Sequence, residues 1–278
     1  MKGPVFLSAV LALLLTSGPS NAEAVSLKSL VAKKAAIVRN MHEKATRAIV
    51  QVAQDPAFLD YFEAAHVKDH QRETEAKTRI DHISLAAQKK FQVEEMCLID
   101  ATGVEISRLV QNQIAYDLSS SEADNAFFAP SFKRKPRTTY IVPSYLSADV
   151  AKWVVAYTTP IEFAGKSAAI LHYEHGLDVY QAALNKEPVG PDTYIVAVDD
   201  EGFVVSDSRK AIPTAKRNDE THPAVYFERF SLEGRSLGDV RALLNEKVDG
   251  TLAFEGATYD VALEKVADWT IVGIQHAR

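Results

Sequence analysis

The feature that most constrains the fold is a strand-turn-strand pattern that occurs twice, 99 residues apart. In each copy an Asp is followed three residues later by a Gly, as Asp100 with Gly103 and Asp199 with Gly202, between apolar and β-branched residues. An Asp side chain at the turn entry bonds the backbone that follows it, and Gly tolerates the positive φ of a tight turn. Each copy therefore predicts a β-hairpin.

A second repeated feature is a charged residue, a Trp and a strand-like run, at Lys152-Trp153 and at Asp268-Trp269, 116 residues apart. Between the two sets of repeats, residues 187–192 have the Pro and Gly content of a linker. We therefore expect an α+β fold with two related antiparallel-sheet modules in tandem, a first over residues 91–187 and a smaller second over residues 188–278.

Residues 1–24 have the features of a secretory signal peptide. Lys2 supplies a positive charge, and the apolar run Val5–Leu15 is 11 residues long, whereas a membrane-spanning helix needs about 20. Small residues follow the run, so we expect cleavage near Ala22 or Ala24 and a periplasmic or secreted protein. The alternative is an uncleaved N-terminal anchor.

Composition argues against several classes of function. The net charge of −6 disfavours a nucleic-acid partner, because phosphate binding needs a basic surface. Cys97 is the single cysteine, so no intrachain disulfide can form, and its apolar neighbours predict a buried core residue without chemistry. The motifs of common hydrolases, metalloproteases and phosphate-binding loops are missing, so we expect no enzyme, no cofactor and no bound metal.

Residues 25–90 predict a helical stalk. Apolar residues recur at three- and four-residue steps from Leu27 to Val52, which is typical of a long amphipathic helix. Asp55-Pro56 interrupts this pattern, and further helices are expected near 57–66 and 68–90. A helix of this length buries its apolar stripe against a sheet edge or against a second copy of itself, so a homodimer through the long helix is an open alternative.

The remaining elements follow from alternation and turn residues. In the first module we expect strands at 91–100, 104–111, 140–142, 152–162 and 166–174, a short helix from 119–122 through Phe128, and a helix over 176–186. In the second module we expect strands near 193–198, 203–207, 251–254, 258–263 and 269–275, and a helix near 237–246.

Three segments, Leu98–Arg108, Val142–Tyr145 and Trp153–Leu171, carry a resemblance to a known family. Their order behind a long N-terminal helix resembles the double Cache, PAS-like, sensor domains of bacterial chemoreceptors and sensor kinases, over essentially the whole mature chain. The resemblance implies a small-molecule site in the first module, between the sheet and the segment Phe128–Tyr145 that crosses its face. Receptors of the family continue into a transmembrane helix, whereas this sequence ends at Arg278, so it implies signalling through a membrane-bound partner.

In the amino-acid-binding branch of that family, an Arg-x-Trp-Tyr run holds the ligand carboxylate, and an acid at the end of the last strand of the first sheet holds the amine. By resemblance, Glu174 stands at the place of that acid. The run itself is missing, since the nearest basic residues form the segment Lys133–Arg137 with no Trp after it.

Residue chemistry also indicates a ligand site in the first module. Arg137 and nearby tyrosines suit an anionic or zwitterionic ligand, because a guanidinium meets a carboxylate bidentately. By the two-residue period of a strand, Trp153 and Tyr157 share one face, and His172 and Glu174 share a face of the next strand. The alternatives are a solvated basic loop around Arg137 and plain core packing for the two aromatic residues. The candidate ligand-binding residues are Arg137, Tyr140, Tyr145, Trp153, Tyr157, His172 and Glu174.

The favoured function is that of an exported sensor protein of double Cache type, which binds a small organic ligand and passes its ligand state to a membrane-bound sensor kinase or receptor in signal transduction. One alternative is a ligand-free interaction or structural module that uses the helical stalk. A more distant alternative is a metal-dependent enzyme in which His172, Glu174 and His175 bind a transition metal.

Overall fold

The structure is a computed structural model that describes residues 26–187, 189–216, 219 and 221–277. The expected signal peptide, residues 1–24, and its alternative as an uncleaved anchor lie outside these residues. Within the described part of the chain, no helix combines the length and the apolar character that a membrane span requires.

Three helices precede the first sheet: α1 (Leu27–Val52), α2 (Pro56–Val67) and α3 (His70–Phe91). Asp55 and Asp69 cap α2 and α3, since each carboxylate accepts a hydrogen bond from a backbone N–H of the first helical turn. Lys68 adopts the left-handed conformation (φ 59°) and reverses the chain between α2 and α3. The interruption predicted at Asp55-Pro56 is therefore confirmed, and α3 begins after its cap rather than at Lys68.

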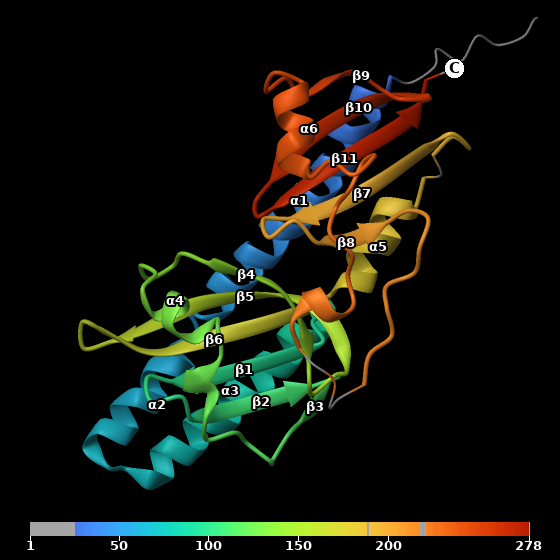
Figure 1. Ribbon diagram of the computed structural model, residues 1–278. Helices are drawn as coiled ribbons and strands as arrows, with labels where there is room; N and C mark the ends of the chain where they lie inside the picture. Colours follow the sequence, from blue (N-terminus) through green and yellow to red (C-terminus); the bar gives the residue numbers. More distant parts are fainter. Residues whose placement is uncertain (1–25, 188, 217–218, 220, 278) are drawn as a thin grey trace, which may run out of the picture.

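The first sheet has six antiparallel strands in the order β3-β2-β1-β6-β5-β4. Helices α1 and α3 pack on one face, and the short elements η1 and α4 cover the other (Figure 1). The bounds are β1 (Glu95–Asp100), β2 (Glu105–Val110), β3 (Gln113–Ile114), η1 (Glu122–Asp124), α4 (Phe128–Phe132), β4 (Tyr140–Ser147), β5 (Lys152–Phe163) and β6 (Lys166–Gly176).

The second sheet has five antiparallel strands in the order β8-β7-β11-β10-β9. Helix α6 packs on one face through Val240, together with Leu244 directly after the helix, and α1 packs on the other. The bounds are α5 (Leu177–Asn185), β7 (Thr193–Asp199), β8 (Val204–Asp207), η2 (Pro223–Val225), α6 (Leu237–Leu243), β9 (Asp249–Phe254), β10 (Ala257–Val266) and β11 (Trp269–His276). The predicted α+β fold with two antiparallel sheets is confirmed.

Both predicted hairpins are present as β1–β2 and β7–β8. Asp100 Oδ1 accepts hydrogen bonds from the backbone N–H groups of Thr102 and Val104 at 2.8 and 3.0 Å. Gly103 and Gly202 both have φ of 88°, the conformation for which glycine was expected. The repeated sequence pattern therefore encodes the same turn in both sheets.

Helix α1 packs along both sheets of its own chain (Figure 1). Near its start, Val31 lies against Gly273 of β11, where an added Cβ would approach the Val31 side chain to 2.4 Å. Farther along, Val38 and Ile49 are buried in the core shared with β5. Of the two uses expected for its apolar stripe, the structure shows burial against the chain's own sheets.

Several elements differ from the sequence-based expectation. The strand expected over 91–100 begins at Glu95, because α3 extends to Phe91, and the short strand β3 is not among the expected elements. Strand β4 continues from Tyr140 to Ser147 instead of ending at Val142, because an irregularity between Val142 and Tyr145 lets its pairing with β5 resume. The short helix expected from residue 119 onward is split into η1 and α4. The longer β4 and the segment that contains η1 and α4 both contribute residues that line the candidate site.

Candidate functional site

Polar side chains gather on the face of the first sheet that α4 covers. Side chains alternate along a strand, so Glu95 and Cys97 of β1 lie on this face, and His172 and Glu174 of β6 lie beside them. The strand register places Cys97 opposite His172 and Glu95 opposite Glu174. Each of the two paired strands therefore contributes two polar side chains, at alternate positions, to the same face of the sheet.

A cavity with a volume of about 290 Å³ lies over these residues. Phe127, next to α4, and residues of β4 form its other walls. The cavity is lined by Glu95, Cys97, Ile99, Glu105, Glu122, Asn125, Phe127, Tyr145, Leu146, Ser147, Ala148, Asp149, His172, Glu174 and Thr221.

Tyr145 joins the two candidate polar residues of β6. Its hydroxyl donates to Glu174 Oε1 and lies 3.0 Å from His172 Nε2. Because the Tyr145 hydroxyl donates its hydrogen to Glu174, it accepts a hydrogen bond from His172 Nε2. The imidazole hydrogen is therefore on Nε2, and Nδ1 carries a lone pair. Burial lowers the pKa of His172 to about 3, and its ring stacks on Phe127 with centroids 4.6 Å apart.

Three buried carboxyl groups make the cavity acidic. Burial, followed in importance by the nearby Glu174, raises the pKa of Glu95 well above its ordinary value. Burial also raises the pKa of Glu174 to about 7 and that of Glu105 above its usual range. All three are 5 % exposed or less. Removal from water is the common cause, because it penalises the charged form of a carboxyl.

Arg108 is a buried cation beside the cavity, and acids already surround it. Its guanidinium lies 3.6 Å from Glu105, 3.3 Å from Asp149 and 2.8 Å from Asp117. Since these three carboxylates share one guanidinium, the positive charge of Arg108 is largely compensated within the protein. The described residues that line the cavity therefore include several carboxyl groups but no Lys or Arg side chain.

Three of the seven candidate ligand-binding residues come together in this cavity: Tyr145, His172 and Glu174. Arg137 does not, because it lies on an exposed loop with φ of 63° and lines a separate hollow beside Thr159–Glu162. Tyr140 packs at the edge of the α4 layer, with the guanidinium of Arg134 5.0 Å from its ring centre.

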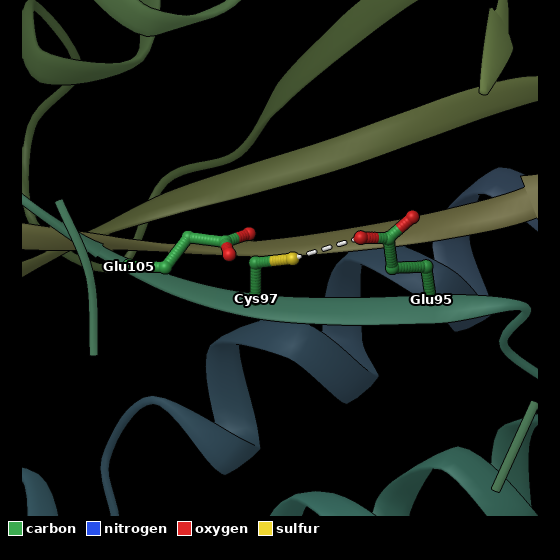
Figure 2. Close-up of side chains that lie close together, drawn as sticks. All are labelled: Glu95, Cys97 and Glu105. Carbon is green, nitrogen blue, oxygen red and sulfur yellow. Dashed lines mark hydrogen bonds between the residues drawn. The ribbon is translucent and has the colours of Figure 1, made fainter. Parts of the chain in front are cut away.

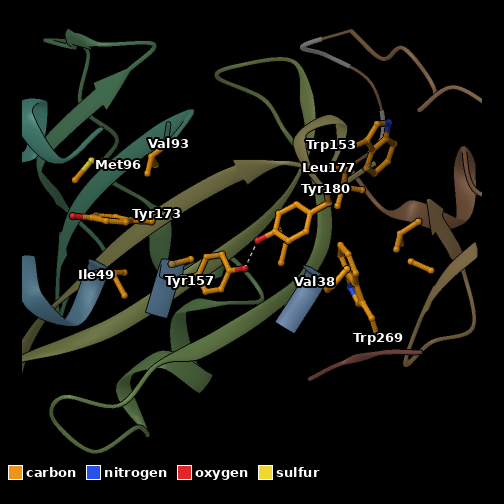
Figure 3. Packing of buried hydrophobic residues seen from close by; sticks show 14 of the residues in the cluster. Val38, Ile49, Val93, Met96, Trp153, Tyr157, Tyr173, Leu177, Tyr180 and Trp269 are labelled. Carbon is orange, nitrogen blue, oxygen red and sulfur yellow. Dashed lines mark hydrogen bonds between the residues drawn. The ribbon is translucent and has the colours of Figure 1, made fainter. Parts of the chain in front are cut away.

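Trp153 and Tyr157 lie on the opposite face of β5 from the cavity, in the core under α1 (Figure 3). Trp153 packs edge-on against Phe227, with ring centroids 4.8 Å apart. The Tyr157 hydroxyl is hydrogen-bonded to Tyr180 and lies 2.6 Å from His42 Nδ1. The prediction that Trp153 and Tyr157 share one face of β5 is correct. The prediction that this face lines a ligand pocket is wrong, because the face belongs to the core.

The metal site considered from His172, Glu174 and His175 is also corrected. His175 follows Glu174 directly and points to the other face of β6, where its ring lies 5.4 Å from that of Tyr157. A different set converges in the cavity: single ligand atoms of Glu95, Cys97 and Glu105 all lie within 4.8 Å of one another. Figure 2 shows the thiol of Cys97 between the two carboxyl groups.

Sequence reasoning missed Glu95, Cys97 and Glu105. The available signal was an acid in an otherwise apolar strand, since Glu95 precedes Met96-Cys97-Leu98-Ile99. A charged group inside a buried strand needs a partner or a ligand. Its pairing with β6, however, is a long-range feature that no local pattern reports.

A scan against protein-family models and a search of curated proteins each found no match. Among solved structures, the sensory domain of the Campylobacter jejuni chemoreceptor Tlp3 with isoleucine bound superposes with a TM-score of 0.67 at 13% identity, covering 90% of this chain and 91% of that chain. The ligand-binding domain of Tlp3 in complex with L-valine gives a TM-score of 0.67 at 12% identity, covering 90% and 91% of the two chains.

The sensor domain of the V. cholerae histidine kinase DctB superposes with a TM-score of 0.60 at 12% identity, covering 90% of this chain and 95% of that chain. These similarities extend over both sheets and the N-terminal helices, because they cover nine-tenths of each chain. The chain therefore has the fold of the double Cache, PAS-like sensor domains.

Proposed function

We propose that this protein is an exported sensor module that binds a small positively charged ligand in the cavity of the first sheet and passes its ligand state to a membrane-bound receptor or kinase. The observation that carries the proposal is the group of three buried carboxyls, Glu95, Glu105 and Glu174, around one cavity. The similar solved structures include chemoreceptor and kinase sensor domains, which supports a sensor role.

The sign of the ligand charge follows from the cavity wall. An anion would repel the buried carboxylates, whose ionisation is already unfavourable. A cation would instead stabilise their charged form. The expectation of an anionic or zwitterionic ligand rested on Arg137 and nearby tyrosines, and Arg137 lies outside the cavity. The isoleucine and L-valine in the Tlp3 structures carry an ammonium group, and the cavity acids here could hold such a group.

A route from the cavity to the second half of the molecule supports the signalling part of the proposal. The backbone N–H of Leu146, a cavity residue, donates to the carbonyl of Thr221 at 3.0 Å. Thr221 belongs to the long segment that follows β8 of the second sheet. A ligand that moves β4 would therefore act on this segment directly.

Thermal-shift measurements on the purified protein test the proposed function. The panel contains amines and amino acids, divalent metal ions, and organic acids as a contrast. A ligand at about 100 times its dissociation constant adds roughly 2.7 kcal/mol to the free energy of unfolding, which is easily detected. Stabilisation by cations that is weakened in Glu174→Gln supports the proposal. Stabilisation by organic acids alone, or by no compound of the panel, would contradict it.

The ligand-free interaction module is the second candidate, and α2 provides the observation that favours it. Leu59 and Val67 are 51% and 61% exposed, which is unusual for large apolar side chains on one short helix. Among the described residues of α1, in contrast, no large apolar side chain is exposed. A contact surface on the helical part would therefore be centred on α2 rather than on the long helix.

A further inference from the structure

We propose that the cavity of the first sheet binds a divalent transition-metal ion of the zinc type through Cys97, Glu95 and Glu105. This inference deepens the proposed function, on which it rests, by naming the cation that the acidic cavity takes. The three side chains come from the paired strands β1 and β2 and lie close together (Figure 2).

The distances are close to those of a metal site. Cys97 Sγ lies 3.2 Å from Glu95 Oε1, and the ligand atoms of all three residues lie within 4.8 Å of one another. With metal–sulfur bonds of about 2.3 Å and metal–oxygen bonds of about 2.1 Å, neighbouring ligand atoms in a tetrahedral site lie about 3.4 to 3.7 Å apart. Small side-chain rotations therefore suffice to close the site.

Burial distinguishes this cluster from a group of acids on the protein surface. Glu95, Cys97 and Glu105 are 4%, 3% and 5% exposed. Two carboxyls and a thiol in contact inside a protein repel one another as soon as they lose their protons. A divalent cation bound among them would compensate these negative charges.

Two further buried groups of the same cavity have unused lone pairs. Among the described residues, Glu174 Oε2 and His172 Nδ1 have no hydrogen-bond donor, although each residue is only 3% exposed. The contact of Tyr145 with His172 Nε2 fixes which imidazole nitrogen stays free. The strand register sets His172 opposite Cys97 and Glu174 opposite Glu95, and both residues line the same cavity as the three ligands.

The type of ligand atom selects the metal. Thiolate and imidazole suit Zn²⁺, Co²⁺ and Ni²⁺, whereas Mg²⁺ and Ca²⁺ prefer oxygen ligands only. Cys97 would bind as a thiolate after giving its proton to solvent, so that the thiolate and two carboxylates carry three negative charges. The guanidinium of Arg108, 3.6 Å from Glu105 and shared with Asp117 and Asp149, would offset part of the one negative charge that a divalent ion leaves.

Titration of the purified, metal-free protein with Co²⁺ tests the inference, because a cobalt–thiolate bond gives an intense charge-transfer absorption in the near ultraviolet. We expect this band to saturate at one ion per chain and Zn²⁺ to displace it. Cys97→Ser should abolish the band, and Glu105→Gln should weaken binding by at least about tenfold. Glu162→Gln, which changes an exposed acid at the end of β5, is the matched control and should bind as the unchanged protein does.

The melting temperature of each metal-free variant shows whether it folds, and Glu95→Gln replaces Glu105→Gln if the latter does not. No charge-transfer band, or a band that persists in Cys97→Ser, would overturn the inference. If amines stabilise the protein and Co²⁺ and Zn²⁺ do not, the metal inference fails and the proposed function stands. If no cation of either kind binds, both fail.

Discussion

Glu95 on β1 lies directly opposite Glu174 on β6, and the two side chains are 4% and 3% exposed. Two carboxyls that face each other away from water cannot both be ionised cheaply, so the pair holds a proton or attracts a cation. Burial raises the pKa of Glu174 to about 7 and that of Glu95 well above its ordinary value. The pair is therefore electrostatically unfavourable in the free protein, and a cationic ligand would reduce this destabilisation.

Replacing one member of this pair should stabilise the free protein. In Glu174→Gln the amide oxygen can still accept from Tyr145, and its N–H can donate to Glu95. At pH 8 we expect the free energy of unfolding of the ligand-free protein to rise by about 1 to 3 kcal/mol, because one buried charge is removed. Chemical denaturation at pH 8 measures this. A less stable variant would show that the two carboxyls do not repel each other.

Removing the hydroxyl of Tyr145 should destabilise the protein. Tyr145→Phe leaves Glu174 Oε1 and His172 Nε2 without this shared partner in a buried place. We expect a loss of about 1 to 3 kcal/mol in the free energy of unfolding, the cost of unsatisfied buried polar groups. Tyr116→Phe is the matched control, since Tyr116 is 88% exposed. Equal effects of the two substitutions would contradict the hydrogen-bond geometry of the site.

The features of the fold that could be predicted from the sequence are those determined by local chemistry. The Asp100 and Asp199 turns depend on residues within four positions of each other, and both hairpins were correctly predicted. The same holds for the break at Pro56, which cannot continue the hydrogen bonds of α1. Local rules also placed His172 and Glu174 on a common face of one strand.

The site itself was predicted only in part, because it depends on pairing between distant strands. Nothing local indicates that Cys97 lies opposite His172, so the sequence alone predicts an inert core thiol. The strand period identified Trp153 and Tyr157 as partners, but which face of β5 is core depends on α1 and α5 packing there. Charge alone favoured Arg137, and only the loop geometry shows that it faces solvent.

His42 should make the protein less stable in acid. It is buried on α1 between Tyr157, Tyr180 and His175, and burial lowers its pKa to about 4. Because the unfolded chain takes up this proton near pH 6.5 and the folded chain does not, its contribution to stability is present above pH 6.5 and is lost as the pH falls towards 4.

The difference in unfolding free energy between the unchanged protein and His42→Gln should therefore shrink by up to about 3 kcal/mol from pH 7 to pH 4. Urea denaturation at several pH values measures it. His66→Gln, at an exposed position on α2, serves as control and should give a difference that changes little. A difference for His42→Gln that is constant with pH would show that this imidazole can be protonated in the folded protein.

The contact between α1 and the second sheet should be sensitive to a single methyl group. An added Cβ at Gly273 would lie 2.4 Å from Val31 Cγ2 and 3.0 Å from Leu27 Cδ1, and both belong to the first turns of α1. Gly273→Ala should therefore push the start of the helix away from β11 and cost about 1 to 3 kcal/mol. Gly190→Ala is the matched control, because the nearest atom to its added Cβ is 3.7 Å away. Thermal denaturation compares the two variants, and hydrogen exchange of the α1 amides shows where the loss falls. If Gly273→Ala melts like Gly190→Ala and the α1 amides keep their protection, α1 does not pack on β11 as closely as described.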